Sequence, residues 1–181
     1  HDADLISYNS AVRSKKGHTS MDGWTEAKRR IELERVEKTN RLDLSHLALR
    51  ELPEEVCELT DLWCLELEYN ELRSLPDGIG HLQELEILNL FSNELTELPD
   101  SLCDCTQLEQ LFLGINRLKR LPEDIGQLQQ LQELYVFSNA LVELPNSLSH
   151  LSQLEELHVY RNQLLLLPED LGQCRSLRHL N

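Results

Sequence analysis

The sequence predicts an α/β solenoid built from stacked repeats, and two regularities carry this prediction. An asparagine and a proline each recur at intervals of 23 residues, the asparagine at Asn70, Asn93, Asn116, Asn139 and Asn162 and the proline six times between Pro53 and Pro168. One template, LxxLxLxxNxLxxLPxxIxxLxx, joins them in six full copies that begin at residues 39, 62, 85, 108, 131 and 154, and a truncated seventh copy begins at residue 177. A fixed period of this length is typical of solenoid proteins.

Within each copy, the LxxLxL segment predicts a short strand whose leucines face the interior. Such a strand cannot bury its apolar face alone, so the copies must stack and the stability becomes a sum over neighbouring interfaces. The asparagine stands where the chain leaves the strand, and we expect its amide to satisfy backbone groups that the turn buries. We expect each proline to hold the returning limb extended rather than helical.

The chain before the repeats divides into two segments. Residues 1–21 show no periodicity and predict a flexible N-terminal tail. Residues 22–38 predict a capping helix with Asp22 as its N-cap and with Trp24, Ala27 and Ile31 on one face. This helix would cover the first copy, in which Leu47 replaces the asparagine. The alternative role of its Lys-Arg-Arg run is a basic docking element.

The repeat region, residues 39–181, ends in the middle of a copy. Leu165 and Leu166 occupy positions that the other copies fill mostly with charged or polar residues. An apolar pair at an end without a polar cap favours the hypothesis that the native chain continues beyond Asn181.

This pattern resembles the leucine-rich repeat superfamily, in the 23-residue LPxxI form of its intracellular members. Those members include plant Ras-group proteins, animal polarity scaffolds, Roco GTPases and secreted bacterial effectors. The resemblance covers residues 39–181 without insertion or deletion. It implies a right-handed horseshoe with a parallel β-sheet on the concave side.

Side-chain alternation places positions 3, 5, 7 and 8 of each copy on that concave side. All three phenylalanines and three of the four tyrosines occupy these positions. Neighbouring strands are ~4.8 Å apart, so the residues from Phe91 to Tyr160 would form one patch ~15 Å across. An exposed apolar patch usually marks a partner site. The alternative is that the rings stabilise the sheet as cross-strand pairs.

We therefore predict a protein-binding site on the concave face. The predicted anchors are Phe91, Phe112, Tyr135, Phe137 and Tyr160, and the residues predicted to set the register are Tyr69, Glu68, Glu133, His158 and Arg161.

The charge of the chain narrows the class of partner. There are 32 acidic and 17 basic residues, for a formal net charge of -15. Binding to nucleic acid or to anionic membranes needs the opposite sign. Acidic residues flank the aromatic positions, namely Asp43, Glu66, Glu68, Glu133 and Glu156. The predicted partner is thus a protein with an apolar centre and basic flanks, and the oligomeric state is left open.

Catalytic and metal chemistry is not predicted. The sequence contains no nucleophile elbow, P-loop or HExxH motif. Four of the five cysteines occupy core or small-residue positions of the template, whereas Cys64 stands at the outward position 3, and zinc-site spacing is absent. His158, His179 and Glu156 could approach one another, but histidines in outward positions are more often simply surface residues. We therefore expect neither an enzyme nor a cofactor or metal.

Two features indicate a reducing compartment. The number of cysteines is odd, and no Asn-x-Ser/Thr glycosylation site occurs. The predicted location is the cytoplasm, or a host cytosol if the chain is a bacterial effector. The alternative function is the substrate-targeting or regulatory arm of a larger enzyme, such as a ubiquitin ligase effector or a Roco-type GTPase whose catalytic domain follows Asn181.

Overall fold

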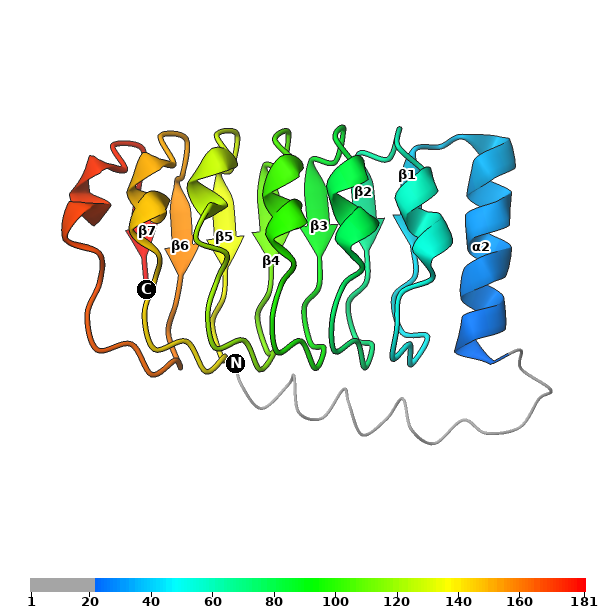
Figure 1. Cartoon of the computed structure of the whole chain (residues 1–181), viewed down its shortest axis with the longest axis horizontal. Coiled ribbons are helices and arrows are strands. Elements are labelled where there is room, and N and C mark those ends of the chain that lie inside the picture. Colours follow the sequence, from blue (N-terminus) through cyan, green and yellow to red (C-terminus); the bar gives the residue numbers. More distant parts are fainter. Residues whose placement is uncertain (1–21) are drawn as a thin grey trace.

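A computed structural model describes residues 22–181, in which one α-helix precedes a series of short parallel strands (Figure 1). The tail predicted for residues 1–21 lies outside this range. The helix is α2 (Gly23–Glu37). Within the described residues the strands are β1 (Arg41–Asp43), β2 (Cys64–Glu66), β3 (Ile87–Asn89), β4 (Gln110–Phe112), β5 (Glu133–Tyr135), β6 (Glu156–His158) and β7 (His179–Leu180).

The strands form one parallel sheet in the order β1-β2-β3-β4-β5-β6-β7. Equivalent template positions lie directly opposite each other, as Leu65 does with Leu88 and Leu88 with Leu111. A register in which each partner is 23 residues away places every template position in its own column across the sheet. The predicted solenoid with an N-terminal helix is therefore confirmed.

The prediction of an extended returning limb is wrong. Each copy instead forms a short 3₁₀ helix just after its proline: η1 (Glu54–Glu58), η2 (Asp77–His81), η3 (Asp100–Asp104), η4 (Ile125–Gln127), η5 (Asn146–His150) and η6 (Glu169–Gln173). Pro76 itself is extended, with φ -68° and ψ 149°, and its carbonyl accepts a hydrogen bond from the Ile79 amide at 3.0 Å. Proline lacks an N–H group, which is no loss at the start of a helix.

The interior is an apolar core between the sheet and the 3₁₀ helices. The strand leucines Leu65, Leu88, Leu111 and Leu134 are fully buried. Each central copy also buries three leucine or isoleucine residues after its strand, as the third copy does with Leu95, Leu98 and Leu102. In the last full copy Leu164 is only half-buried and Leu167 is 44% exposed.

The asparagine amides satisfy buried backbone groups, as predicted, and these groups belong to two consecutive copies. The Asn93 side chain donates to the carbonyls of Leu67 and Leu90 at 2.9 and 3.1 Å, and it accepts from the Leu72 amide at 3.1 Å. Leu67 and Leu72 belong to the preceding copy, whereas Leu90 belongs to the same copy as Asn93. One buried amide thus satisfies backbone groups on both sides of an interface between copies.

Helix α2 covers the first copy. The Asp22 side chain accepts from the Thr25 amide at 2.8 Å and caps the helix as predicted, while Ala27 and Ile31 are buried. Trp24 was expected on the same buried face but is 42% exposed. The start of the helix lies so close to the first copy that a Cβ atom at Gly23 would be 1.7 Å from the Leu47 carbonyl oxygen.

Candidate functional site

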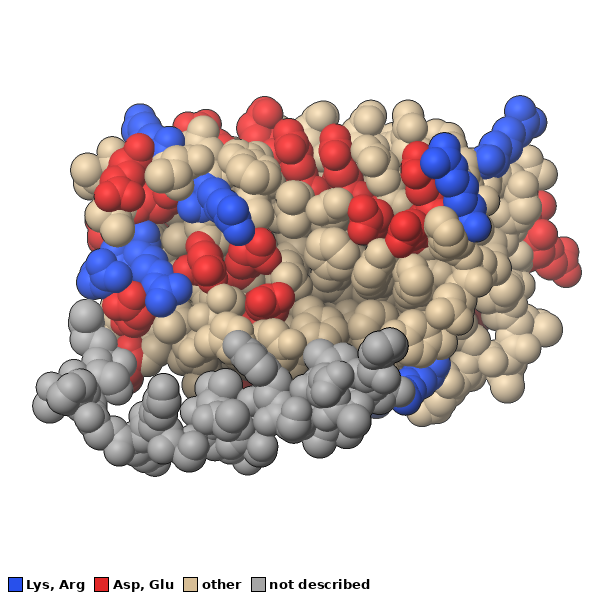
Figure 2. Space-filling view, turned by 180° about the vertical axis from the view of Figure 1, so that it is seen from behind, with Lys and Arg blue, Asp and Glu red and all other residues tan. Residues whose placement is uncertain are grey.

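The predicted binding residues lie on the face of the sheet opposite the 3₁₀ helices. Figure 2 shows this face as a broad area of uncharged residues, with acidic side chains along one border and over its middle and with basic side chains towards the two ends. The strands themselves are shorter than expected, because positions 7 and 8 follow the last strand residue. Backbone pairing nevertheless continues past the strands, since the Tyr69 amide donates to the Phe91 carbonyl at 2.9 Å.

Position 8 of each copy has a left-handed backbone. Its φ lies between 53° and 58° at His46, Tyr69, Ser92, Ile115, Ser138 and Arg161. Side chains other than glycine adopt this conformation at some cost in energy. The turn out of the sheet therefore repeats with one geometry, although the residue that occupies it differs from copy to copy.

Five aromatic side chains form a long row across the sheet. His46 stacks on Tyr69 with ring centroids 4.5 Å apart, and Tyr69 meets Phe91 edge-on at 5.5 Å. Phe91 contacts Phe137 at 6.0 Å, and Phe137 stacks on Tyr160 at 4.8 Å. These separations are those of favourable aromatic pairs. The long row combines four predicted residues with His46, which was not among them.

The contact between Phe91 and Phe137 depends on a glycine. The two phenylalanines are two copies apart, and Gly114 occupies the equivalent position between them. A Cβ atom at residue 114 would lie 2.7 Å from two atoms of the Phe137 ring. The missing side chain therefore gives the ring the space in which it reaches towards Phe91. The sequence does show a single glycine, Gly114, between Phe91 and Phe137 at position 7 of successive copies. Only the structure shows that the Phe137 ring occupies the space that this glycine leaves.

Three further aromatic side chains form a short row. Phe112 meets Tyr135 edge-on at 5.1 Å, and Tyr135 contacts the His158 ring at 4.4 Å. The two rows meet where His158 and Tyr160 are 6.5 Å apart. Tyr135 and Phe137 thus belong to different rows, although they are two residues apart in sequence. We call the eight residues of both rows the aromatic face: His46, Tyr69, Phe91, Phe112, Tyr135, Phe137, His158 and Tyr160.

The aromatic face is accessible, but most of its rings also pack on one another. Phe91, Phe112, Tyr135 and Phe137 are half-buried, and Tyr160 is 38% exposed. None of the phenylalanines points into the core. Arg161 and Ile115 stand exposed beside the long row.

The acidic side chains predicted to flank the aromatic positions already have partners. The Glu68 carboxylate accepts from the Asn89 amide at 2.6 Å, and the Glu133 carboxylate accepts from the Gln110 amide at 2.8 Å. Glu66 lies 3.4 Å from the Arg41 guanidinium, and Asp43 accepts from Ser45. A basic partner would therefore share these carboxylates with groups of the chain itself.

The short row ends in a polar cluster around Glu156. The Tyr135 phenol donates to its carboxylate at 2.5 Å, and nitrogen atoms of His158 and His179 lie 3.4 and 3.7 Å from its oxygens. Burial raises the pKa of the Tyr135 phenol, and the hydrogen bond to Glu156 raises it further. The same hydrogen bond lowers the pKa of Glu156. Among residues 22–181, no group of three or more His, Cys, Asp and Glu side chains could hold a metal ion.

The cysteines are unsuited to thiol chemistry. Cys64 was placed among the outward positions, and its sulfur atom lies 3.7 Å from the Glu66 carboxylate on that face, but the side chain is covered and only 2% exposed. Burial raises the pKa of the Cys64 thiol to about 11 and that of Cys105 to about 12. Because the thiolate is the reactive form, thiols with a raised pKa react slowly at neutral pH.

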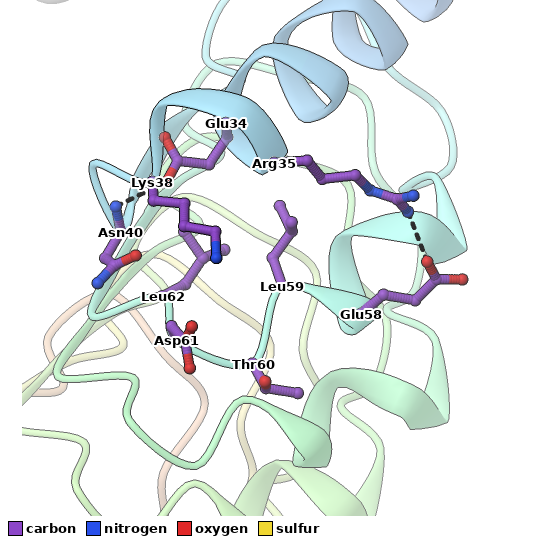
Figure 3. A pocket seen from close by; sticks show the side chains of 9 residues that line it. All are labelled: Glu34, Arg35, Lys38, Asn40, Glu58, Leu59, Thr60, Asp61 and Leu62. Carbon is purple, nitrogen blue, oxygen red and sulfur yellow. Dashed lines mark hydrogen bonds and ion pairs between the residues drawn. The ribbon is translucent and has the colours of Figure 1, made fainter.

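A hollow of about 220 Å³ lies between the end of α2 and the first two copies (Figure 3). Three of its charged groups, those of Glu34, Arg35 and Glu58, bind other groups of the chain. The Glu34 carboxylate is 7% exposed and accepts from the Thr39 hydroxyl and the Asn40 amide, while Arg35 forms an ion pair with Glu58 at 2.5 Å. This hollow is the joint between the helix and the solenoid, because its polar groups hold the two together.

No helix in the described range is both long enough and apolar enough to span a bilayer. This finding concerns residues 22–181 alone.

Comparison with protein families gives one consistent match. The family described as leucine rich repeat matches residues 65–118, 83–141 and 106–164, which together span more than half of the chain. Plant intracellular Ras-group-related LRR protein 8 from Arabidopsis thaliana is 44% identical over 51 residues. That alignment includes 28% of this chain and 13% of the plant protein, so the chain spans only a small part of this relative.

Two solved structures share the fold over most of the chain. YopM from Yersinia enterocolitica aligns with 99% of this chain and 36% of its own, with 29% identity and a TM-score of 0.75. The ectodomain of the receptor kinase GASSHO1/SCHENGEN3 from Arabidopsis thaliana aligns with 77% of this chain and 18% of its own, with 32% identity and a TM-score of 0.69. That ectodomain was solved in complex with Casparian strip integrity factor 2.

Proposed function

The chain belongs to the leucine-rich repeat family, and on that premise we propose that it binds a partner protein on its aromatic face. Leucine-rich repeats are typically non-enzymatic modules that mediate protein–protein interaction, and the GASSHO1 ectodomain binds such a partner. The proposal makes this chain a recognition module in which the sheet positions the contact residues.

The observation that carries the proposal is the continuity of the two aromatic rows. Rings in contact from His46 to Tyr160 form one connected apolar surface on an otherwise acidic chain. Because the parallel sheet fixes the backbone beneath each ring, the partner would not have to order these side chains on binding. Binding to a preorganised surface costs less conformational entropy than binding to a mobile one.

The contact residues have distinct roles in this proposal. Phe91, Phe112, Tyr135, Phe137 and Tyr160 provide the apolar contact area, and aromatic residues are enriched in interface hot spots. Tyr69, His158 and Arg161 set the register of the partner. Glu68 and Glu133 attract basic flanks, although their present hydrogen bonds to Asn89 and Gln110 reduce the gain.

The location that fits this proposal is a reducing one, such as a cytosol. The five described cysteines are free and buried, and the matched plant relative carries the word intracellular in its name. Free thiols persist where the environment is reducing.

A second candidate function is that of a partner-binding domain within a larger protein. One form of it is the substrate-targeting or regulatory domain of an enzyme. The observation that favours it is the mouse relative, which is 44% identical over 58 residues and whose name joins leucine-rich repeats to a calponin homology domain. Sequencing the full transcript tests it, and a reading frame with no further domain would contradict it.

The test of the main proposal compares Phe137→Ala with the parent chain. Affinity capture identifies candidate partners, and isothermal titration then measures the affinity of each purified one. Removal of one buried ring from an interface costs ~1.5–3 kcal/mol, which corresponds to an affinity loss of about 10-fold to 100-fold. Val142→Ala is the matched control, because Val142 is apolar and 49% exposed but lies outside the aromatic face.

Thermal unfolding of the same variants separates recognition from sheet stability. We expect Phe137→Ala to lose binding while its melting temperature stays close to that of the parent. A large fall in melting temperature with unchanged affinity would mean that the rows serve only to stabilise the sheet.

A further inference from the structure

A second surface lies at the start of helix α2, and none of its residues belongs to the aromatic face. Trp24 stands at the start of this helix with 42% of its surface exposed. It lines two hollows, one of about 540 Å³ and one of about 450 Å³, and both also include Glu51. An exposed tryptophan between two hollows is unusual for a capping helix, because tryptophan is normally among the more buried side chains.

The fold does not need this tryptophan for capping. Ala27 and Ile31 provide the apolar contact of α2 with the first copy and are fully buried. Trp24 lies one turn before Ala27, at the start of the helix, and lines a hollow together with Leu47 of the first copy. A large apolar ring that the core leaves exposed is the kind of residue that dominates binding energy when a partner covers it.

The larger hollow combines an apolar base with an acidic rim. Leu52, Leu75 and Pro76 line it together with Trp24, and no lysine or arginine does. The carboxylates of its rim belong to Glu51, Glu54, Glu55 and Glu58. This composition is complementary to a segment that carries both apolar and basic side chains.

The ion pairs show which carboxylates are available. Lys28 binds Glu55 at 2.7 Å, and Arg35 binds Glu58 at 2.5 Å. Glu51 and Glu54 form no ion pair with any other residue of the described range 22–181. Two carboxylates beside an exposed ring are therefore open to a cation from outside.

Lys28 shows within this chain how a cation binds the Trp24 ring and a nearby carboxylate together. Its ammonium nitrogen is 5.3 Å from the centre of the Trp24 ring and 2.7 Å from the Glu55 carboxylate. A cation between an aromatic ring and a carboxylate gains from both the ring quadrupole and the charge. Glu51 and Glu54 could bind an incoming lysine or arginine near the same ring.

From these observations we propose that the Trp24 surface, consisting of Trp24, Leu52, Leu75, Pro76, Glu51 and Glu54, docks a short segment of a partner protein in which leucine-like and basic residues alternate. The apolar side chains would cover Trp24 and the leucines, and the basic side chains would bind Glu51 and Glu54. This site is separate from the aromatic face, so a partner could engage both surfaces or two partners could bind together.

The test uses two synthetic peptides as probes with the full chain. One alternates leucine and arginine, and the other alternates leucine and glutamate. A Trp63→Phe background leaves Trp24 as the single tryptophan, so a shift of its fluorescence reports binding. We expect the leucine–arginine peptide to shift the emission with saturation below about millimolar concentration and the leucine–glutamate peptide to leave it unchanged. Equal shifts from both peptides, or none, would overturn the proposal.

Variants locate the bound peptide, with its anisotropy as a second readout. Trp24→Ala should abolish binding, and Glu54→Gln should weaken it about threefold or more. Val36→Ala is the matched control, because Val36 lies on the same helix and is 80% exposed but lines neither hollow. Circular dichroism verifies that each variant is folded. Loss of binding in Phe137→Ala but not in Trp24→Ala would assign the peptide to the aromatic face and overturn the proposal.

Two other occupants would also overturn it. If residues of this same chain occupied the site, replacing the basic residues that precede the helix (Arg13→Ser, Lys15→Ser and Lys16→Ser together) would tighten peptide binding severalfold. If a second copy occupied it, sedimentation would show a dimer that Trp24→Ala dissociates. Unchanged affinity in the triple variant and a Trp24-independent oligomeric state support a partner protein as the occupant.

Discussion

The two sides of the parallel sheet follow opposite rules within the same strands. On the interior side, position 4 of the copies from Leu65 to Leu157 is always leucine and always fully buried. One residue further along each strand, position 5 changes at every copy, from glutamate in β2 to asparagine, phenylalanine, tyrosine and histidine in β3 to β6. Adjacent residues face opposite sides of a strand, so the two rules coexist without conflict.

This difference separates stability from recognition. Interior residues repeat because each must fit the same neighbours in the copies before and after it. Residues of the aromatic face contact solvent and one another, so they can vary while the core persists. A substitution on the interior side should therefore change stability but hardly change binding, and a substitution on the aromatic face should do the reverse. Four predictions test this separation in order of decreasing effect.

Leu111→Ala should cause the largest loss of stability. Leu111 is fully buried in the central strand β4, and truncation of such a leucine costs about 2–5 kcal/mol because it removes apolar contacts and leaves a cavity. Urea unfolding followed by circular dichroism measures the loss. Leu166→Ala is the control, since Leu166 is 81% exposed and its truncation should change stability little. Similar losses for both variants would contradict the burial argument.

Asn93→Ala should have the next largest effect. The alanine removes the partners of the Leu67 and Leu90 carbonyls and of the Leu72 amide, and an unsatisfied buried polar group costs about 1–3 kcal/mol. Urea unfolding should show a loss of at least about 2 kcal/mol. Asn89→Ala is the control on the aromatic side, because Asn89 is half-buried and its amide donates to Glu68. A greater loss in the control would show that the side of the sheet does not decide the cost.

Gly114→Ala should have an intermediate effect that depends on Phe137. The added methyl group would meet the Phe137 ring at 2.7 Å, so the ring must move away from Phe91 at a cost of about 1–3 kcal/mol. In the Gly114→Ala and Phe137→Ala double variant the clash is absent. The double variant should then be more stable than the sum of the two single effects predicts, and strict additivity would rule out the contact as the cause.

The smallest expected effect concerns the Tyr135 phenol. An unfolded-chain tyrosine ionises near pH 10, and burial together with the Glu156 carboxylate raises the pKa of Tyr135 in the folded chain. This contribution to stability is complete below that pH and is lost as the pH rises through the folded pKa. Ultraviolet titration against Tyr135→Phe should reveal one phenol that ionises above pH 10. Ionisation near pH 10 would show that the hydrogen bond to Glu156 does not persist in solution.

Much of the fold could be predicted because the repeat is a local rule. The 23-residue spacing predicted the stacking of the copies and their buried columns, because each depends only on neighbouring copies. It also predicted that an amide such as that of Asn93 satisfies buried backbone groups, but not that these groups belong to two copies. The prediction of an extended returning limb was wrong because a proline after a leucine suits either an extended segment or the start of a 3₁₀ helix. Cys64 lies on the outward side and is nevertheless buried, because alternation gives the direction of a side chain and not what covers it.

The chain itself therefore determined which residues stand on the outer side of the sheet, because strand alternation follows from backbone geometry alone. Only the tertiary structure decided how those residues group. The rings of Phe91 and Phe137 meet across Gly114 while Tyr135 joins a different row. Trp24 remains 42% exposed although the helix that carries it covers the first copy. Both outcomes depend on distances between side chains that are remote in sequence, and a periodic pattern does not contain these distances.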